Sequence, residues 1–576
     1  MRKILMLLAA VLIVLLGGCT EYLPTSGTTT ATTQTTAITE SSQPTSTLTG
    51  VTTAATITTT TAAPTTVTTA PQTEATTIPA TTLPPPTAST TITTTISTAR
   101  YQTIEIYGMN DFHGGAYTDP SMIAKIGNFL IQRKALNEDA IFLAHGDMLQ
   151  GTALSNYYYG LPIIEALNIA GFSGFTIGNH EFDWGIEMVG AYRDGDPANG
   201  EADYPLLAAN IVYTDTQELL PWFEPYTIIE SGPVRIGVIG VIGPLQGSIS
   251  ASRLTNITFL DLVNTVADYA QFLRTEADCD IVIVSAHDYN SYTNYQLASL
   301  TGNSRIDAIF NGHSHTSVAG IVPGTNVPYA QASNYSSSLF TKITLVYDNQ
   351  MQTITSAGAE VFREVQLTTA NPAIDAMLGV FLGDEDYQSF VTHVLATAQA
   401  SFGRSALAPW GASVIRDYAG VDFGVVNGGG FRVTMDQGAV TNGDLVVIYP
   451  FDNTIRTCEL TGQQLTDFYA SAPYDLYFDD QVSYSGGVLY KNGVPVVLSQ
   501  LYTVGAVDYV FDKDNFIFLD GENITTTPYM MRDLLANDLE NAIGQFNPAN
   551  GTSFTPTVPV AYDYHISLFK IAVVVL

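Results

Sequence analysis

A repeated strand, turn and helix pattern constrains the fold of this chain more than any other feature of its sequence. Between residues 101 and 360, short apolar runs are each followed by a polar, glycine-containing turn and then by a helix-length segment. The runs end in YGMNDFHG, FLAHGD, FTIGNHEFD, VSAHD and FNGHSH. This alternation predicts a layered α/β domain over residues 101–362. The polar residues fall at the carboxyl ends of the strands, where open α/β sheets place their sites.

A second folded segment is predicted after a connecting helix. The sequence NPAIDAMLGVFL lies within residues 363–385, which we interpret as a linker helix. Residues 386–545 mix strand and helix patterns, so we expect a smaller α/β or α+β domain there. Residues 546–576 form a tail to which the sequence assigns no role, and its last apolar stretch is too short to span a bilayer.

The first 100 residues differ in composition from the rest. Residues 1–19 begin with a basic pair, continue with an apolar run and end in LGGC, which predicts a signal peptide. LGGC also resembles a bacterial lipobox, in which Cys19 would carry the lipid; the alternative is a plain cleaved signal. Residues 20–100 consist largely of Thr, Ala, Ser and Pro, which predicts a disordered stalk. We therefore expect an exported, lipid-anchored protein on the cell surface or in the periplasm, and no other membrane contact.

Charge and cysteine content exclude some functions. The formal net charge of −33 argues against nucleic acid as a partner, because a polyphosphate backbone would be repelled. The same repulsion means that a site for a small phosphate ester needs metal ions or isolated arginines. Apart from Cys19, the only cysteines are Cys279 and Cys458, which lie in different predicted domains, so no disulfide framework is expected.

The strand-end motifs contain a set of metal-ligand residue types. The set comprises five of the eight histidines, two aspartates and an asparagine. The residues are Asp111, His113, Asp147, Asn179, His180, His287, His313 and His315. Oxygen and imidazole donors of this kind suit Zn, Mn, Fe or Co better than Ca. A shared carboxylate can hold two cations about 3.5–4 Å apart, which is typical of two-metal hydrolytic sites.

The same motifs resemble a known family. DFH, GD, GNHE and GHSH resemble the metallophosphoesterase signature, while NGGGFR (427–432) and YPF (449–451) resemble the second domain of the exported 5′-nucleotidase and UDP-sugar hydrolase family. The resemblance covers about residues 102–545. It implies a four-layer β-sandwich flanked by helices, with a second, smaller substrate-binding domain. It also implies two divalent metals, one held by Asp111, His113, Asp147 and His315, and the other by Asp147, Asn179, His287 and His313.

The resemblance further assigns chemistry to the GNHEFD motif. His180 resembles the catalytic histidine of the family, placed to donate a proton or hydrogen bond to the leaving oxygen. Asp183 would orient that imidazole and favour its charged form. The resemblance assigns no role to Glu181, for which we favour that of a carboxylate at a helix start.

Substrate residues are predicted in the second domain. Asn427, Gly429 and Arg432 of NGGGFR would approach and grip a phosphate, with Arg404 as a further family arginine. Phe451 and Tyr509 would sandwich a nucleobase, and Asp514 would contact the base or ribose. The alternatives are a glycine-rich turn with an exposed Arg432, and two aromatic rings that belong to the core.

These features together imply a phosphohydrolase that acts on nucleoside 5′-monophosphates and other nucleotides outside the cytoplasm. An alternative enzyme with the same site would cleave 2′,3′-cyclic nucleotides or UDP-sugars. A cell-surface binding module is the non-enzymatic alternative, but it would have no need of the His180–Asp183 pair. We expect a monomer, with a dimer as the alternative.

Overall fold

The computed structural model describes residues 99–551, apart from 116–118, 120, 334–338, 364–366 and 543. The predicted signal peptide with Cys19, almost all of the predicted stalk and residues 552–576 lie outside the described residues. Within the described part of the chain, no helix is both long enough and apolar enough to cross a membrane.

Two six-stranded sheets form the first domain. The first sheet has the order β14-β13-β1-β2-β3-β4. Its strands are β1 (Tyr101–Met109), β2 (Ile141–Ala144), β3 (Phe175–Thr176), β4 (Leu206–Leu207), β13 (Phe340–Asp348) and β14 (Thr353–Phe362). Strands β1 to β4 run parallel, whereas β13 pairs antiparallel with both β1 and β14. Helices α1 (Met122–Leu136), α2 (Ala153–Tyr157) and α3 (Leu161–Ala170) connect the parallel strands.

The second sheet has the order β11-β12-β10-β9-β7-β6. Its strands are β6 (Tyr226–Ser231), β7 (Val234–Ile242), β9 (Ile281–His287), β10 (Ala308–Asn311), β11 (Val318–Ile321) and β12 (Pro328–Gln331). Strands β7, β9, β10 and β12 are parallel, so their carboxyl ends lie along one edge. Helices α5 (Leu262–Thr275) and α6 (Ser291–Ala298) flank this sheet.

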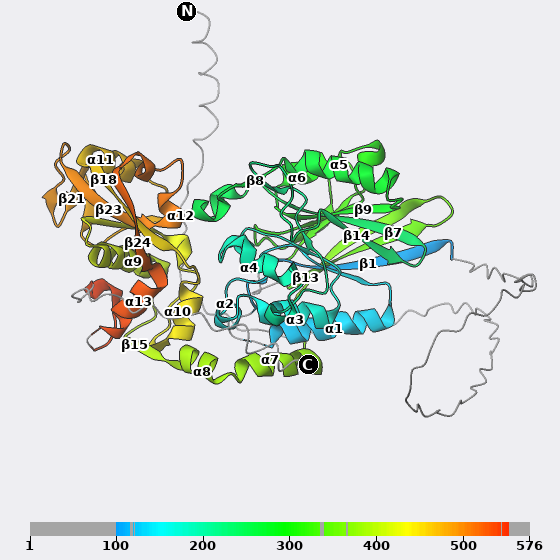
Figure 1. The fold of residues 1–576 in the computed structure, drawn as a ribbon, viewed down its shortest axis with the longest axis horizontal. Helices are drawn as coiled ribbons and strands as arrows, with labels where there is room; N and C mark the ends of the chain where they lie inside the picture. Colours follow the sequence, from blue (N-terminus) through cyan, green and yellow to red (C-terminus); the bar gives the residue numbers. More distant parts are fainter. Residues whose placement is uncertain are drawn as a thin grey trace, which may run out of the picture. The chain divides into compact units, whose positions relative to one another are not determined.

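The sheets stack face to face because their strands are apolar on both faces. In β9, Ile281 and Ile283 join the core between the two sheets, while Val282 and Val284 join the core beneath α5 and α6. The outer face of the first sheet packs on α1 and α3. Figure 1 shows these two helices on one side of the sheets and α5 and α6 on the other. The predicted four-layer α/β fold is confirmed.

The predicted connecting helix is α7 (Pro372–Leu382), which starts after the N-cap Asn371. It does more than connect the domains, because its apolar side chains belong to the core that α1 and α3 form with the first sheet. Ile374, Leu378 and Phe381 are buried there. Helix α8 (Glu385–Thr392) follows.

The second domain contains a five-stranded sheet in the order β19-β16-β23-β18-β24. Its strands are β16 (Phe423–Asn427), β18 (Thr454–Thr461), β19 (Leu476–Phe478), β23 (Leu501–Val507) and β24 (Glu522–Met530), with helices α9 (Arg404–Ala419), α10 (Asn442–Ile448), α11 (Gly462–Ser471), α12 (Asp508–Phe511) and α13 (Met531–Glu540). Smaller sheets of this domain pair β15 (Val394–Ala398) with β17 (Gly438–Thr441), and β21 (Val488–Lys491) with both β20 (Val482–Ser485) and β22 (Val494–Pro495). In the first domain, β5 (Ile211–Tyr213) pairs with β8 (Ile257–Phe259).

Packing in the second domain continues past residue 545, where we expected it to end. The Phe546 ring is 4% exposed, and its centroid lies 5.0 Å from that of Trp410. Cys279 and Cys458 are free, buried and members of separate apolar clusters.

Candidate active site

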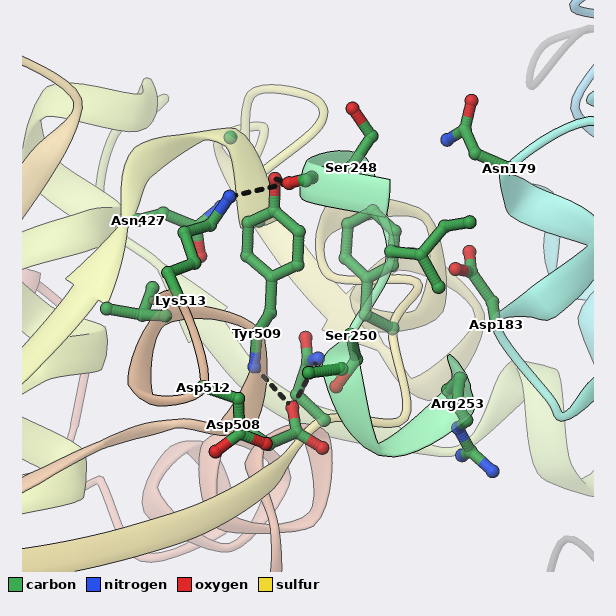
Figure 2. A pocket seen from close by; sticks show the side chains of 18 of the residues that line it. Asn179, Asp183, Ser248, Ser250, Arg253, Asn427, Asp508, Tyr509, Asp512 and Lys513 are labelled. Atoms are coloured by element: carbon green, nitrogen blue, oxygen red, sulfur yellow. Dashed lines mark hydrogen bonds between the residues drawn. The ribbon is translucent and has the colours of Figure 1, made fainter. Parts of the chain in front are cut away.

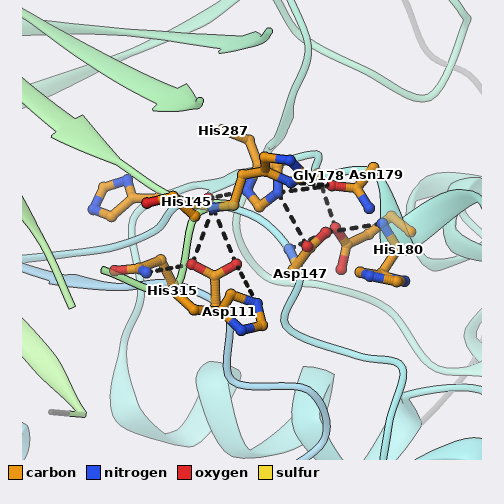
Figure 3. A network of polar contacts seen from close by, with 12 residues as sticks. Asp111, His145, Asp147, Gly178, Asn179, His180, His287 and His315 are labelled. Carbon is orange, nitrogen blue, oxygen red and sulfur yellow. Dashed lines mark hydrogen bonds and ion pairs between the residues drawn. The ribbon is translucent and has the colours of Figure 1, made fainter. Parts of the chain in front are cut away.

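Five strand ends of the first domain bring the predicted metal ligands together. The ligands follow or end β1, β2, β3, β9 and β10, and these strands are neighbours within their two sheets. His287 Nε2 lies 3.1 Å from Asp147 Oδ2, and His315 Nε2 lies 3.3 Å from Asp111 Oδ1. The Asn179 side-chain oxygen is 2.8 Å from His313 Nδ1 and 3.2 Å from His287 Nε2. Figure 3 shows this network of converging side chains.

The donor atoms form three overlapping groups, each with its atoms within 4.8 Å of one another. The groups are Asp111 with His113 and His315, His113 with Asp147 and His180, and Asp147 with His287 and His313. Two of them overlap with the two predicted ligand sets. All seven predicted ligands are thus close together, and His180 lies beside them.

Backbone conformation also distinguishes the ligands. Five of them have positive φ although none is glycine: Asp111 (51°), His113 (51°), Asp147 (54°), His313 (75°) and His315 (53°). This conformation is uncommon for such residues, costs free energy and clusters at functional sites. His113 Nε2 and His315 Nε2 are moreover only 3.1 Å apart, a contact between two atoms that both bind metals well. The donor types and their spacing therefore fit divalent metal ions.

Hydrogen bonds hold two of the carboxylates in place. Both oxygens of Asp111 accept from the His313 backbone N–H at 3.0 Å. Asp147 Oδ1 accepts from the His180 backbone N–H at 2.8 Å. Gly146 between the strand and Asp147 has a φ of 87°, and a Cβ there would lie 2.2 Å from His287 Nδ1. Only glycine can therefore occupy this position without displacing the imidazole.

His180 and Asp183 form the predicted pair. His180 begins the short 3-10 helix η1 (His180–Phe182), Asp183 directly follows it, and His180 Nδ1 lies 2.8 Å from Asp183 Oδ2. Burial lowers the pKa of His180, but the charges of Asp183 and Asp147 outweigh it and raise the pKa above its ordinary value. The charged imidazole is therefore favoured.

Glu181 lies in the first turn of η1, as expected for a helix-start carboxylate, but it has a further role that the sequence did not predict. Its carboxylate is fully buried and accepts from the backbone N–H groups of Asp147 (2.8 Å), Met148 (2.9 Å) and Gly178 (2.8 Å). Burial and the charge of Asp147 raise the pKa of Glu181 to about 7. Glu181 thus ties the loop that carries Asp147 to the loop that carries Asn179.

A cavity of about 930 Å³ opens onto this cluster. The first domain contributes Asp147, Asn179, His180, Asp183, His313 and His315 to its lining, and the second domain contributes Asn427, Gly429, Arg432, Phe451, Tyr509 and Asp514. Figure 2 shows the pocket, with Asn179 and Asp183 on one side and Asn427, Tyr509 and Lys513 on the other.

Family models match both domains: a calcineurin-like phosphoesterase model covers residues 104–317 and a 5′-nucleotidase C-terminal domain model covers residues 388–520. The chain belongs to this combined phosphoesterase and 5′-nucleotidase family. Members of this kind are metal-dependent phosphoester hydrolases, and the Asp and His groups described above could bind the divalent metals that the family uses.

The chain is also similar to individual proteins and to a solved structure. The chain is 27% identical over 417 residues to the endonuclease YhcR of Bacillus subtilis, a match that covers 66% of this chain and only 34% of YhcR. It is 26% identical over 454 residues to an apyrase of Tabanus yao, covering 68% of this chain and 77% of the apyrase. The crystal structure of a 5′-nucleotidase precursor from Thermus thermophilus is similar with a TM-score of 0.60 at 19% identity, covering 76% of this chain and 96% of that one.

In the 5′-nucleotidase C-terminal domain, Arg432 lines the cavity whereas Arg404 lies behind its lining. Arg432 has no ion-pair partner among the described residues, and its guanidinium carbon lies 5.7 Å from the centroid of the Phe451 ring. Arg404 donates to the Phe431 carbonyl at 3.3 Å, lies 3.8 Å from Asp475 and does not line the cavity. Of the two predicted arginines, only Arg432 lines the cavity, while Arg404 contacts Phe431 beside it and Asp475 of the lining.

The two predicted aromatic rings of this domain both line the cavity, but each already has a neighbour. The Phe451 ring stacks on His180 with a centroid distance of 5.8 Å and an angle of 28°. The Lys513 ammonium lies 4.2 Å from the centroid of Tyr509. A nucleobase would therefore have to use the remaining face of each ring.

Sequence reasoning missed a first-domain segment that reaches the same cavity. It contains the 3-10 helices η4 (Gln246–Ser248) and η5 (Ala251–Leu254), and Arg253 from η5 lines the cavity. Tyr509 Oη and Lys513 Nζ both donate to the Gly247 carbonyl, at 3.4 and 2.6 Å. No motif marks this segment, and the only signal was the scarcity of cations such as Arg253 and Lys513 in so acidic a chain.

Proposed function

We propose that this chain is an extracytoplasmic two-metal phosphohydrolase that removes phosphate from nucleoside 5′-monophosphates. One observation carries the proposal: a single cavity is lined by metal-ligand residues, by the His180–Asp183 pair and by an unpaired arginine and two aromatic rings of the second domain.

In this proposal Asp111, His113, Asp147 and His315 hold one divalent ion. Asp147, Asn179, His287 and His313 hold the other, which makes Asp147 the shared ligand. Such ions polarise phosphoryl oxygens and lower the pKa of water, so that a nucleophile is available at neutral pH. Zn, Mn, Co and Fe all suit these donors.

The other residues of the chain bind and orient the ester. Arg432 can donate two parallel hydrogen bonds to the phosphate, with the backbone of Asn427 and Gly429 close to it. Phe451 and Tyr509 offer ring faces to the base, and Asp514 offers an acceptor to base or ribose. His180 donates a proton to the departing ribose oxygen from the nitrogen that Asp183 leaves free.

The proposal includes export. Support comes from the signal pattern of residues 1–19 and from Cys19 in LGGC, which we propose carries a lipid anchor ahead of the Thr-rich stalk. We propose that the protein acts as a monomer.

The test is a substrate panel on the full chain after chelation and reconstitution with Mn, Zn, Co or Fe. It compares AMP, GMP, UMP and CMP with cyclic nucleotides and UDP-sugars, and Asp147→Asn serves as the metal-deficient control. We expect the monophosphates to have the highest kcat/KM. A preference for a cyclic or sugar nucleotide would overturn the proposed substrate, and no turnover with any metal would overturn the proposed enzyme.

A further inference from the structure

One buried histidine has no part in the function proposed above. His145 follows β2 directly and lies two residues before Asp147. Its side chain is fully buried. His145 Nδ1 lies 2.6 Å from Ser285 Oγ, and the ring stacks on Phe310 with a centroid distance of 4.5 Å and an angle of 11°. Figure 3 shows this residue beside the network of predicted ligands.

The His145 ring touches or is linked to every strand that presents a predicted ligand. Ser285 belongs to β9, and its hydroxyl lies 2.5 Å from that of Thr176 in β3. Phe310 belongs to β10. In β1, a Cβ built on Gly108 would lie 2.3 Å from His145 Nε2, so the ring rests directly on that backbone.

These four residues each precede a predicted ligand by no more than three positions. Gly108 precedes Asp111, Thr176 precedes Asn179, Ser285 precedes His287 and Phe310 precedes His313. One imidazole is therefore in contact with, or linked through Ser285 to, the strands from which all seven predicted ligands project.

The backbone of His145 adds two direct constraints. Its carbonyl accepts from His287 Nδ1 at 2.7 Å, which fixes the orientation of that ring and leaves Nε2 directed at Asp147. Its N–H donates to the Met109 carbonyl at 2.7 Å, close to Asp111. Partners of this kind orient ligands and tune their affinity for metal.

We propose that His145 is a positioning residue for the metal site. This inference rests on the ligand set proposed above. An apolar side chain would fill the same space without cost, whereas His145 Nε2 is buried with no hydrogen-bond partner among the described residues. An unpartnered buried polar atom is costly. We attribute the presence of a histidine despite this cost to the bond that its other ring nitrogen, Nδ1, makes with Ser285.

The experiment measures Mn²⁺ affinity by titrating chelator-stripped full-length protein. His145→Phe retains a ring to stack on Phe310 but loses the bond to Ser285, and Ser285→Ala removes the same bond from the other side. We expect each substitution to weaken Mn²⁺ binding about 10- to 100-fold, and the double variant to be no weaker than either single one. His145→Asn, whose side-chain amide can donate or accept a hydrogen bond near the Nδ1 position, should recover part of the affinity.

Leu143→Ala is the matched control, because Leu143 lies two residues earlier in β2 and is buried between the same two sheets. It should lower Tm yet bind Mn²⁺ as the wild type does. Wild-type affinity in both His145→Phe and Ser285→Ala overturns the inference, as does an equal loss in Leu143→Ala. Should His145→Phe fail to fold, the Mn²⁺ affinity of Ser285→Ala alone tests the inference. If the wild type binds neither Mn²⁺, Zn²⁺ nor Co²⁺, the proposed ligand set fails instead.

Discussion

At the scale of single residues, His180 has one ring nitrogen bound to Asp183, while the other has no hydrogen-bond partner among the described residues. The ring lines the cavity. We predict that His180→Ala lowers kcat for AMP about 10²- to 10⁴-fold, the usual range for general acid catalysis, because the ribose oxygen is a poor leaving group. With nitrophenyl phosphate, whose leaving oxygen needs little protonation, the loss should be much smaller.

Metal content, measured by elemental analysis, distinguishes a general acid role of His180 from a role as a metal ligand. His180→Ala should retain the wild-type content, and Asp183→Asn should give a smaller loss of kcat with the same dependence on the leaving group. Equal losses on both substrates, or loss of metal from His180→Ala, would contradict the general acid role.

Removal of the Tyr509 ring and removal of the Phe451 ring should have different effects on catalysis. Tyr509 contacts Gly247 and Lys513. Tyr509→Ala should raise KM for AMP by a factor that corresponds to about 1–3 kcal/mol of binding free energy, the cost of one lost stacking contact. Nitrophenyl phosphate should be unaffected, since it carries no base. Phe451→Ala should impair both substrates, because Phe451 also stacks on His180. An unchanged KM for AMP in Tyr509→Ala would assign that ring to packing.

The convergence of the predicted ligands could be expected from sequence because each lies at or a few residues after the end of an apolar strand, so that its position is locally encoded. Glu181 and His145 could not. The main partner of Glu181 is 34 residues away and that of His145 is 140 residues away. Their roles depend on which loops meet in three dimensions, and no motif records that.

At the scale of elements, the strands of the first domain were predictable because their apolar runs are buried on both faces. Strand β3 shows the limit of this approach, since only Phe175 and Thr176 pair with neighbours although the apolar run is longer. The role of α7 in the core was not predictable either, because an apolar helix between two domains has the same pattern whether it packs or spans a gap.

A buried carboxyl group of α13 accepts a hydrogen bond from α9, and its ionisation should lower the stability of the protein. Asp538 is 5% exposed and accepts from Trp410 Nε1 at 2.8 Å, and burial raises its pKa to about 6 from an ordinary value of 3.8. The folded state thus retains a proton that the unfolded chain releases. The contribution of this protonated carboxyl to the free energy of unfolding is fully present below about pH 4 and is lost as the pH rises to about 6.

We therefore predict that Asp538→Asn gains stability relative to the wild type as the pH rises. Between pH 5 and pH 8 the difference in unfolding free energy should move in favour of the variant by about 1 kcal/mol. Urea denaturation at several pH values measures this difference. Asp436→Asn, at an exposed position, controls for the loss of one charge. A pH-independent difference for Asp538→Asn would show that the carboxyl is ionised in the folded protein.

At the scale of the whole molecule, the substrate cavity combines residues that are far apart in the chain. Its lining extends from Asp147 to Phe516 and draws on both domains. Sequence motifs identified the ligands and the NGGGFR turn, but the segment with Gly247 and Arg253 joins the cavity only because the two domains meet there. If the proposed function holds, the loops that meet here would select among substrates.

The negative charge of the whole molecule should make kcat/KM depend on salt. The chain carries −33 formal charges, and Arg253, Arg432 and Lys513 are the only Arg or Lys residues among those that line the described cavity. A dianionic nucleotide is repelled over a distance set by the Debye length, which falls from about 30 Å at 0.01 M salt to about 10 Å at 0.1 M. We expect kcat/KM for AMP to rise severalfold as salt is added over this range at saturating metal.

Bis(nitrophenyl) phosphate has a single negative charge and should show a smaller rise, because repulsion scales with the product of the charges. If kcat/KM for AMP instead falls with salt, the local field of the metals and Arg432 outweighs the charge of the whole molecule, and Arg432→Ala should then reverse the sign of the slope.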